Sequence, residues 1–245
     1  MSSVLLVLFG GESPDAPLHW ARVSRSSGDI LQRGELESGK AAPASTPADT
    51  VLIIPGSEAQ LRSVQLSASS DIQARAAAAY MFEGALAIEK GHAAFALGKE
   101  ANGRRLVAAF DRRRLQRWID HCNAVGLNPA SIHLNCAIWP VRTGAMQVID
   151  LGGHAIVAGG ELGSFAIESD LVLALLPAWL AQAPGDVDVI EAAGIDATSL
   201  APHLAKPAPP VETISQPNLL AVLCRAASEP PAYAPDLRQG EFATT

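Results

Sequence analysis

"QVIDLGGHAIVAGGE", residues 147–161, is the stretch on which the interpretation of this sequence depends. An apolar run ends at Asp150, turns through Gly152 and Gly153, and gives way to a second apolar run. A glycine pair after a strand can bring backbone N–H groups together around a phosphate. It can also supply the positive φ angles that a tight hairpin turn needs. The stretch is therefore either a nucleotide-binding loop or a hairpin.

Around this stretch, strand-like runs are followed by helical runs, and this order occurs twice. In the second half we expect strands at 144–153, 154–161, 163–169 and 186–194, and helices at 169–182 and 217–227, with a proline-rich break at 201–212. In the first half we expect strands at 3–10, 18–25, 28–36, 50–56, 61–67, 92–99 and 104–110, and helices at 71–91 and 111–126; residues 127–140 read as a loop with a short buried segment. The sequence predicts an α/β protein of two β-meander-plus-helix lobes, the plan shared by actin-like ATPases and sugar kinases.

The expected boundaries follow from the same pattern. We expect a first lobe over residues 1–134 with an inserted strand and helix subdomain, and a second lobe over residues 135–228. Residues 229–245 are rich in proline and polar residues, so we expect a flexible tail outside the core.

Composition limits the classes of function. The chain has 245 residues, of which 49% are hydrophobic and 18% charged, so a folded globular protein is expected. A formal net charge of −7 argues against nucleic acid as a partner. The three widely spaced cysteines are typical of buried thiols in a reducing compartment. The apolar run from Leu171 is much shorter than the ~20 residues of a membrane span, so we expect a cytoplasmic chain.

Nucleotide hydrolysis needs carboxylates, a metal and backbone donors placed together. Actin-like enzymes place an Asp at a glycine turn in each lobe, but here Phe9 occupies the position before the first glycine pair. In the second lobe His154 follows Gly153, where such loops carry a hydroxyl residue, and the adenosine loop keeps only Gly194. We therefore predict no catalytic residue, no cofactor and no metal, and interpret Asp150, Gly152 and Gly153 as a degenerate phosphate loop.

A set of motifs over residues 49–140 resembles the cytoplasmic domain of the type II secretion system protein L family (GspL). The motifs are a strand ending in Pro-Gly, an alanine-rich helix with an internal Glu, an acidic-to-His stretch, and a Leu-x-x-Trp helix running into Gly-Leu-x-Pro. Their residues are Pro55, Gly56, Glu83, Glu89, His92, Leu115, Trp118, Gly126, Leu127 and Pro129. The tail segment Asp236–Phe242 is similar to the part of that family just before its membrane helix.

The resemblance implies a degenerate actin-like (RNase H-like) fold and a non-catalytic adaptor of the inner-membrane secretion platform. It further implies that the secretion ATPase GspE docks through its N-terminal domain, that other platform proteins are partners, and that the full-length protein is a homodimer. The chain would be the cytoplasmic part of a single-pass bacterial inner-membrane protein. The alternative is PilM, the pilus-assembly relative, or another actin-like nucleotide-binding protein. PilM usually keeps intact nucleotide loops, which Phe9 disfavours.

Two charged sets are candidates for partner binding. The basic set is Lys99, Arg104, Arg105, Arg112, Arg113, Arg114 and Arg117. It is either a solvated face or a face that meets anionic lipid or an acidic partner. The acidic set is Asp186, Asp188, Glu191 and Asp196. It is either a solvated strand edge or a docking surface for a basic face of the ATPase.

Overall fold

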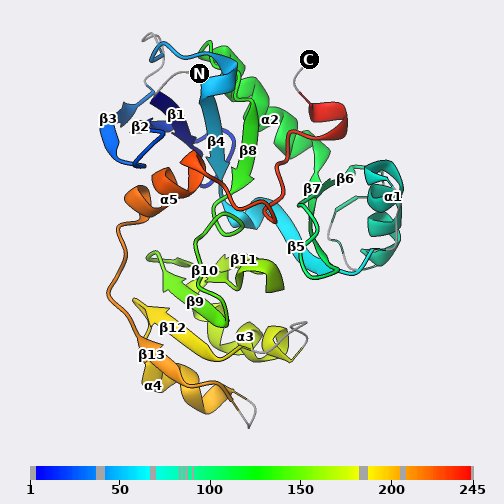
Figure 1. Cartoon of the computed structure of the whole chain (residues 1–245), viewed down its shortest axis with the longest axis vertical. Coiled ribbons are helices and arrows are strands. Elements are labelled where there is room, and N and C mark those ends of the chain that lie inside the picture. Colours follow the sequence, from blue (N-terminus) through cyan, green and yellow to red (C-terminus); the bar gives the residue numbers. More distant parts are fainter. Residues whose placement is uncertain are drawn as a thin grey trace.

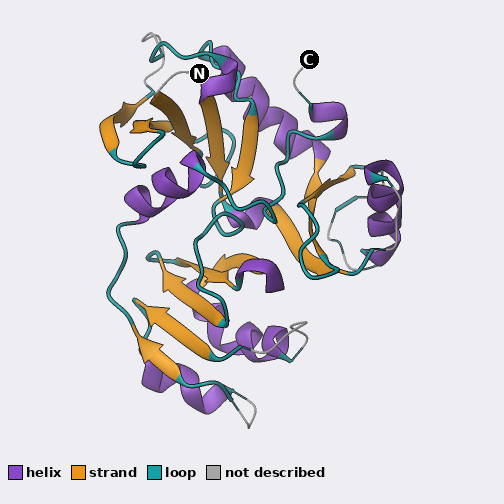
Figure 2. Ribbon diagram, viewed as in Figure 1, coloured by secondary structure: helices purple, strands orange, loops and turns teal. Residues whose placement is uncertain are grey.

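The computed structural model describes residues 4–36, 42–66, 70–82, 84, 86, 88–89, 91–181, 187–204 and 208–243. Glu83 and Asp186 lie outside the described residues. Figures 1 and 2 show three separate sheets: one at the top, one at the bottom, and a smaller one on the right beside helix α1. Within the described part of the chain, no helix combines the length and the hydropathy that crossing a membrane would require.

The first sheet contains three antiparallel strands followed by two parallel ones. Its spatial order is β3-β2-β1-β4-β8, with β4 and β8 parallel to β1. The strands are β1 (Val4–Phe9), β2 (His19–Ser24), β3 (Ile30–Glu35), β4 (Thr50–Ile54) and β8 (Ser131–Leu134). Strand β8 lies in the segment 127–140, for which a loop and a short buried segment were predicted.

The second sheet repeats the topology of the first. Its order is β11-β10-β9-β12-β13, and β12 and β13 are parallel to β9. The strands are β9 (Ala145–Asp150), β10 (His154–Ala158), β11 (Ser164–Glu168), β12 (Val189–Ala193) and β13 (Val211–Thr213). The stretch 147–161 thus forms the central hairpin of this sheet. The predicted repetition of a three-strand meander is confirmed.

The third sheet is inserted between β4 and β8 and has the antiparallel order β5-β7-β6. Its strands are β5 (Ala59–Val64), β6 (Ala93–Leu97) and β7 (Arg105–Asp111), and helix α1 (Asp71–Met81) covers one face. The predicted helix over 71–91 is too long. It ends at Met81 because Phe82 is fully buried against Phe95, and Gly84 then takes a positive φ of 74°.

Helix α2 (Arg112–Ala124) matches its prediction closely. Asp111 caps it by accepting hydrogen bonds from the backbone N–H groups of Arg113 and Arg114. The buried stripe runs along Leu115, Trp118, Ile119 and Cys122. The remaining helices are α3 (Val172–Leu180), α4 (Ala197–Leu200) and α5 (Leu219–Ser228), and the 3₁₀ turns are Pro47–Asp49, Gly56–Glu58, Gly160–Leu162, Ser169–Leu171, Ala201–His203 and Gly240–Phe242.

Helix α5 packs on the first sheet, although the sequence analysis placed it in the second lobe. It contacts β1 and β2, and its residues Leu223 and Cys224 belong to the core of that sheet. The apolar stripe of the amphipathic helix packs on this sheet, and the sequence of the helix alone does not show which sheet will receive it. The division of the chain at residue 134 remains a prediction.

The segment after α5 is packed against the protein, so the expectation of a flexible tail outside the core is wrong for its described part. Leu237 is fully buried, and its backbone N–H donates to the carbonyl oxygen of Ile132 at 2.8 Å. The Asp236 carboxylate accepts from the backbone N–H of Ile132 at 2.9 Å. The tail therefore pairs with the outer edge of strand β8.

The same segment also closes the edge of strand β6. The side-chain amide of Gln239 accepts from the backbone N–H of Leu97 at 3.1 Å and donates to its carbonyl oxygen at 2.8 Å. The backbone N–H of Lys99 donates to Ala232 O at 2.9 Å, and the Phe242 ring lies 6.1 Å from that of Phe110. The tail thus joins the edges of two sheets, which explains why a polar segment belongs to the core.

The tail contact makes stability depend on pH through His133. Its Nδ1 lies 3.2 Å from Pro235 O, and only 4% of the residue is exposed. Burial lowers the pKa of His133 below its ordinary value of 6.5, and the Asp236 carboxylate opposes this shift only in part.

Because the unfolded chain takes up this proton at higher pH than the folded chain, the free energy of unfolding should fall as the pH drops below 6.5. We expect this loss to be no steeper than about 1.4 kcal/mol per pH unit below pH 6.5, and to be shallower for His133→Gln. Urea unfolding at several pH values measures both slopes. Equal slopes for the two proteins would show that His133 does not cause the loss.

Candidate functional site

The β9–β10 turn holds the residues predicted as a degenerate phosphate loop. The Asp150 carboxylate accepts from the backbone N–H of Gly152 at 2.9 Å and from the Ser169 hydroxyl at 2.6 Å. Gly152 and Gly153 have φ angles of 81° and 104°, which a side chain would strain. The turn is thus closed by its own aspartate, and the Gly152 N–H that a phosphate loop would direct at an anion points to that carboxylate instead.

The corresponding turn of the first sheet is adapted to packing. Phe9 ends β1 and packs on the core of the first sheet, where an actin-like enzyme would place an Asp. Gly10 donates its N–H to Ile53 O at 2.8 Å, and a Cβ there would lie 2.6 Å from the ring of Trp118. Close packing of Trp118 therefore explains why residue 10 is glycine, and a bound phosphate is not needed to explain it.

The loop after β12 corresponds to the predicted adenosine loop, and another segment of the chain packs against it. Gly194 has a φ of 73°, and a Cβ on it would lie 2.9 Å from the side-chain oxygen of Gln216. The Gln216 amide donates to Asp150 O at 2.7 Å, which ties the segment before α5 to the β9–β10 turn. Near these loops, Leu151 and Ile214 pack on the core. Across the described residues, no group of three His, Cys, Asp or Glu side chains could hold a metal ion.

The acidic set does not form one surface. Asp188 is exposed just before β12, whereas Asp196 lies beyond the other end of that strand. The Asp196 carboxylate caps α4 by accepting from the hydroxyl and the backbone N–H of Thr198, and these hydrogen bonds lower its pKa. Of the two exposed carboxylates, that of Asp196 thus already accepts hydrogen bonds from within the chain.

Glu191, the third described member, belongs to a polar network that the sequence analysis missed. Its carboxylate accepts from Arg142 Nε and from the Gln147 amide, both at 2.7 Å, and Gln147 in turn accepts from the indole N–H of Trp139 at 2.6 Å. Burial alone would raise the pKa of Glu191, but the hydrogen bonds from Arg142 and Gln147 outweigh it and lower the pKa. The residue joins β12 to β9, and docking of the acidic set on a partner remains a prediction.

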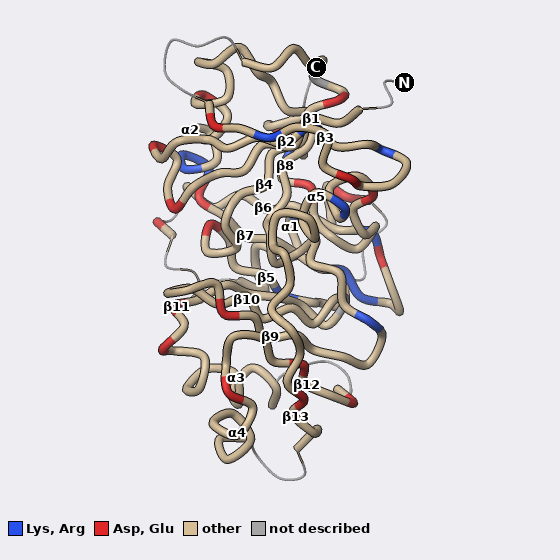
Figure 3. Tube along the Cα trace, turned by 90° about the vertical axis from the view of Figure 1, so that its left-hand side faces the viewer, with Lys and Arg blue, Asp and Glu red and all other residues tan. Residues whose placement is uncertain are grey.

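Each arginine of the basic set contacts an acceptor within the chain. The contacts are Arg104 to Ser63 O at 2.6 Å, Arg105 to Asp71 at 2.6 Å, Arg112 to Glu241 at 2.6 Å, Arg113 to Glu89 at 3.9 Å, Arg114 to Glu58 at 2.5 Å, and Arg117 to Asp15. Lys99 is exposed in the turn after β6. Figure 3 shows acidic and basic positions mixed in the region of α2. Contact of this face with lipid or with a partner remains a prediction, and the neighbouring carboxylates weaken its net positive field.

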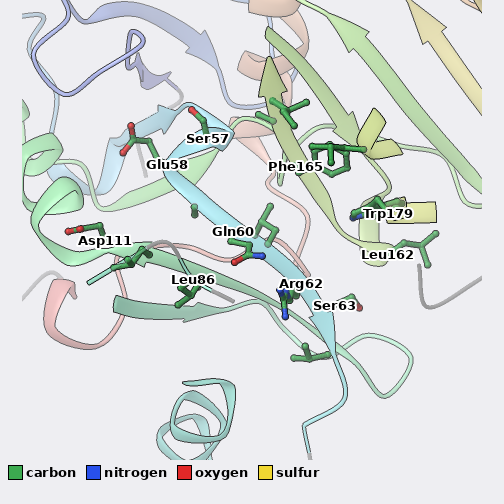
Figure 4. A pocket seen from close by; sticks show the side chains of 18 of the residues that line it. Ser57, Glu58, Gln60, Arg62, Ser63, Leu86, Asp111, Leu162, Phe165 and Trp179 are labelled. Carbon is green, nitrogen blue, oxygen red and sulfur yellow. The ribbon is translucent and has the colours of Figure 1, made fainter. Parts of the chain in front are cut away.

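A groove beside strand β5 is a further candidate that sequence reasoning missed. Its volume is about 820 Å³, and it lies between β5 on one side and β11 and α3 on the other (Figure 4). The signal for it in the sequence is "VLALLPAWL", the whole of α3, which contains no polar residue. A helix that is apolar on all sides is normally buried all round.

Comparison with known proteins identifies the family. The sequence profile described as "Type II secretion system (T2SS), protein L" matches residues 6–245, nearly the whole chain. The chain belongs to the type II secretion system protein L family. The resemblance stated from the motifs of residues 49–140 is therefore confirmed, and the protein is a component of the type II secretion system. A search of curated protein sequences found no match.

Solved structures share the fold of this chain. The cytoplasmic domain of EpsL, an inner-membrane component of the Vibrio cholerae type II secretion system, is 17% identical with a TM-score of 0.71 over 98% of this chain and all of that one. A chain of the PilM-PilN type IV pilus biogenesis complex is 11% identical with a TM-score of 0.57 over 93% of this chain and 99% of that one. The predicted actin-like fold is confirmed.

Proposed function

We propose that this protein is a non-catalytic adaptor on the cytoplasmic side of the bacterial inner membrane. It recruits the secretion ATPase GspE through the N-terminal domain of that enzyme and couples it to the other platform proteins, as a homodimer in its full-length form. The observation that supports this most directly is the β9–β10 turn, in which the Asp150 carboxylate is bonded to Gly152 and Ser169. Both bonds are accepted by Oδ1 of Asp150 and hold the hairpin turn together, so they give this aspartate a structural role in the turn.

Family membership supports the secretion role. The EpsL structure is described as the cytoplasmic domain of an inner-membrane component, and it shares the fold of this chain over almost its whole length. An adaptor needs a stable surface rather than a catalytic cluster, and the three degenerate loops leave the actin-like fold as a scaffold.

Calorimetric titration tests this function. We expect heat of binding when the protein is titrated with the N-terminal domain of its cognate secretion ATPase, and none with Mg-ATP. Saturable Mg-ATP binding that Asp150→Ala abolishes would contradict the proposal and favour the nucleotide-binding alternative. Absence of heat from both ligands would contradict ATPase recruitment by this domain.

A further inference from the structure

Helix α1 carries apolar residues on two opposite sides. Ala74 and Ala78 are buried against the inserted sheet, and Figure 1 shows α1 on the side of that sheet away from the other two sheets. On the opposite side Ile72 and Tyr80 are each 76% exposed, the highest values among the large hydrophobic residues that the structure describes. Single exposed hydrophobic residues are common on protein surfaces, but two of them on the same side of one short helix form an apolar patch.

The exposed side of α1 has an internal two-fold symmetry. Exposed Ala76 lies at its centre, with Ile72 and Tyr80 one turn away in each direction and about 40° to either side around the helix. Gln73 and Ala79 are also exposed and lie about 60° to either side. These five residues are called the outer face of α1. A half-turn about an axis through Ala76 exchanges the position of Ile72 with that of Tyr80, and the position of Gln73 with that of Ala79.

The outer face of α1 carries no charge. The only charged residues of the helix are Asp71 and Arg75, and both lie about 100° or more from Ala76 around the helix. Asp71 accepts from Arg105 Nη1 at 2.6 Å, and Arg75 Nη1 donates to Gln239 Oε1 at 3.4 Å. An uncharged face offers no electrostatic attraction to anionic lipid or to a charged partner, so apolar shape has to select what it binds.

We propose that the outer face of α1 binds the same face of a second copy of this chain, as an antiparallel helix pair with a two-fold axis through Ala76. Such an isologous contact needs a self-complementary surface. The half-turn supplies it, because Ile72 of each copy meets Tyr80 of the other. The alanine at the axis allows the helices to approach to the ~8–10 Å between axes that packed helices adopt. This inference rests on the proposed function only for the homodimer, and it is independent of ATPase recruitment.

The size of the outer face also favours a second copy as the occupant. Helix α1 has 11 residues, a length of roughly 16 Å at ~1.5 Å per residue, so it covers much less than the ~800 Å² per partner of a standard interface. A partner held by this face alone would dissociate readily, whereas two copies that are also joined elsewhere keep a high effective concentration. The C-terminal segment containing Gln239 passes beside α1, so copies joined beyond that segment in the proposed full-length form would hold their outer faces close together.

Disulfide cross-linking of the 245-residue chain tests this contact. The three native cysteines are buried, so the wild type serves as the blank. Ala76→Cys places a thiol on the axis, where the two Cα atoms would lie roughly 5 Å apart, a separation that a disulfide can bridge. Ala79→Cys is the matched control, an exposed alanine of the same face. In this register residue 79 lies roughly 9 Å along the helix from its mate, which is too far for a disulfide.

We expect Ala76→Cys to give at least about tenfold more disulfide-linked dimer than Ala79→Cys under mild oxidation at high protein concentration. A mixture of Ile72→Cys with Tyr80→Cys should exceed either protein alone by a similar factor. Adding Ala76→Glu to both members of that mixture should remove the excess, because two like charges would then meet at the axis. Thermal unfolding of each variant verifies that it is folded.

Equal yields of dimer from Ala76→Cys and Ala79→Cys would indicate random collision and would overturn the proposed register. Absence of cross-linking at residue 76, or a mixture no better than its separate components, would overturn the contact itself. Each of these results would leave ATPase recruitment intact, because the calorimetric titration of the wild type tests that function separately.

Discussion

Gly98→Ala is expected to detach the C-terminal segment from the inserted sheet and to destabilise the protein by about 3 kcal/mol. A Cβ at residue 98 would lie 1.8 Å from the carbonyl oxygen of Tyr233, and both atoms are fixed to backbone. No rotamer change relieves that overlap. The segment has to move away, which breaks the bond from Lys99 to Ala232 and the paired bonds between Gln239 and Leu97.

Denaturant unfolding measures the loss, and limited proteolysis detects the detached segment as early cleavage after residue 228. Gly103→Ala is the control, because Gly103 lies in the same hairpin with open space around it and a φ of 74°. It should cost only the strain of a left-handed alanine, about 1 kcal/mol, and leave the segment protected. Similar losses of stability and similar cleavage in both variants would show that the overlap with Tyr233 does not cause the effect at residue 98.

Some elements could be predicted because their information is local. Helix α2 has a capping Asp111 at its start, Gly126 after its end, and an apolar stripe between them. Each of these signals lies within the helix or directly beside it. The hairpin at 147–161 is likewise encoded by its own glycines. Local signals of this kind locate elements without reference to the rest of the chain.

Other elements depend on residues far away in the sequence. Strand β8 has only four residues, three of them buried, and becomes a strand by pairing with β4 about 80 residues earlier. The alanines of α1 favour a helix without marking its end, which is set by burial of Phe82 against Phe95. The docking of Asp236 on Ile132 joins residues 104 positions apart. Periodicity within a segment contains none of this information.

The candidate site shows the same division. The missing Asp at Phe9 and the single Gly194 are visible in the sequence, and they predict degenerate nucleotide loops. The basic set is also visible, but sequence cannot show that each of its arginines contacts an acceptor from another segment. The groove beside β5 is built from two sheets and a helix, so only the assembled fold reveals it.

Arg114→Met is expected to lower the free energy of unfolding by about 3 kcal/mol, because it leaves the buried Glu58 carboxylate without its partner. Arg114 Nε and Nη2 donate to the two oxygens of Glu58 at 2.8 and 2.5 Å, and the Glu58 side chain is only 4% exposed. Glu58 ends the turn between β4 and β5, which also contacts β11. The same turn contains Gly56, where a Cβ would lie 2.4 Å from Cys136 Sγ. The backbone is therefore closely packed at this junction of the three sheets, and it cannot easily shift to expose an unpaired carboxylate to solvent.

The double variant Glu58→Met/Arg114→Met should regain most of that stability, since two apolar side chains of similar length leave no buried charge. Arg117→Met is the matched control on the same helix, because its pair with Asp15 is exposed on both sides and should contribute about 0.5 kcal/mol or less. Guanidinium chloride unfolding of the three proteins and the wild type gives all the differences. A double variant no more stable than Arg114→Met would mean that the pair itself, and not the stranded carboxylate, determines the loss. The junction of the three sheets would then depend on the ion pair for its geometry.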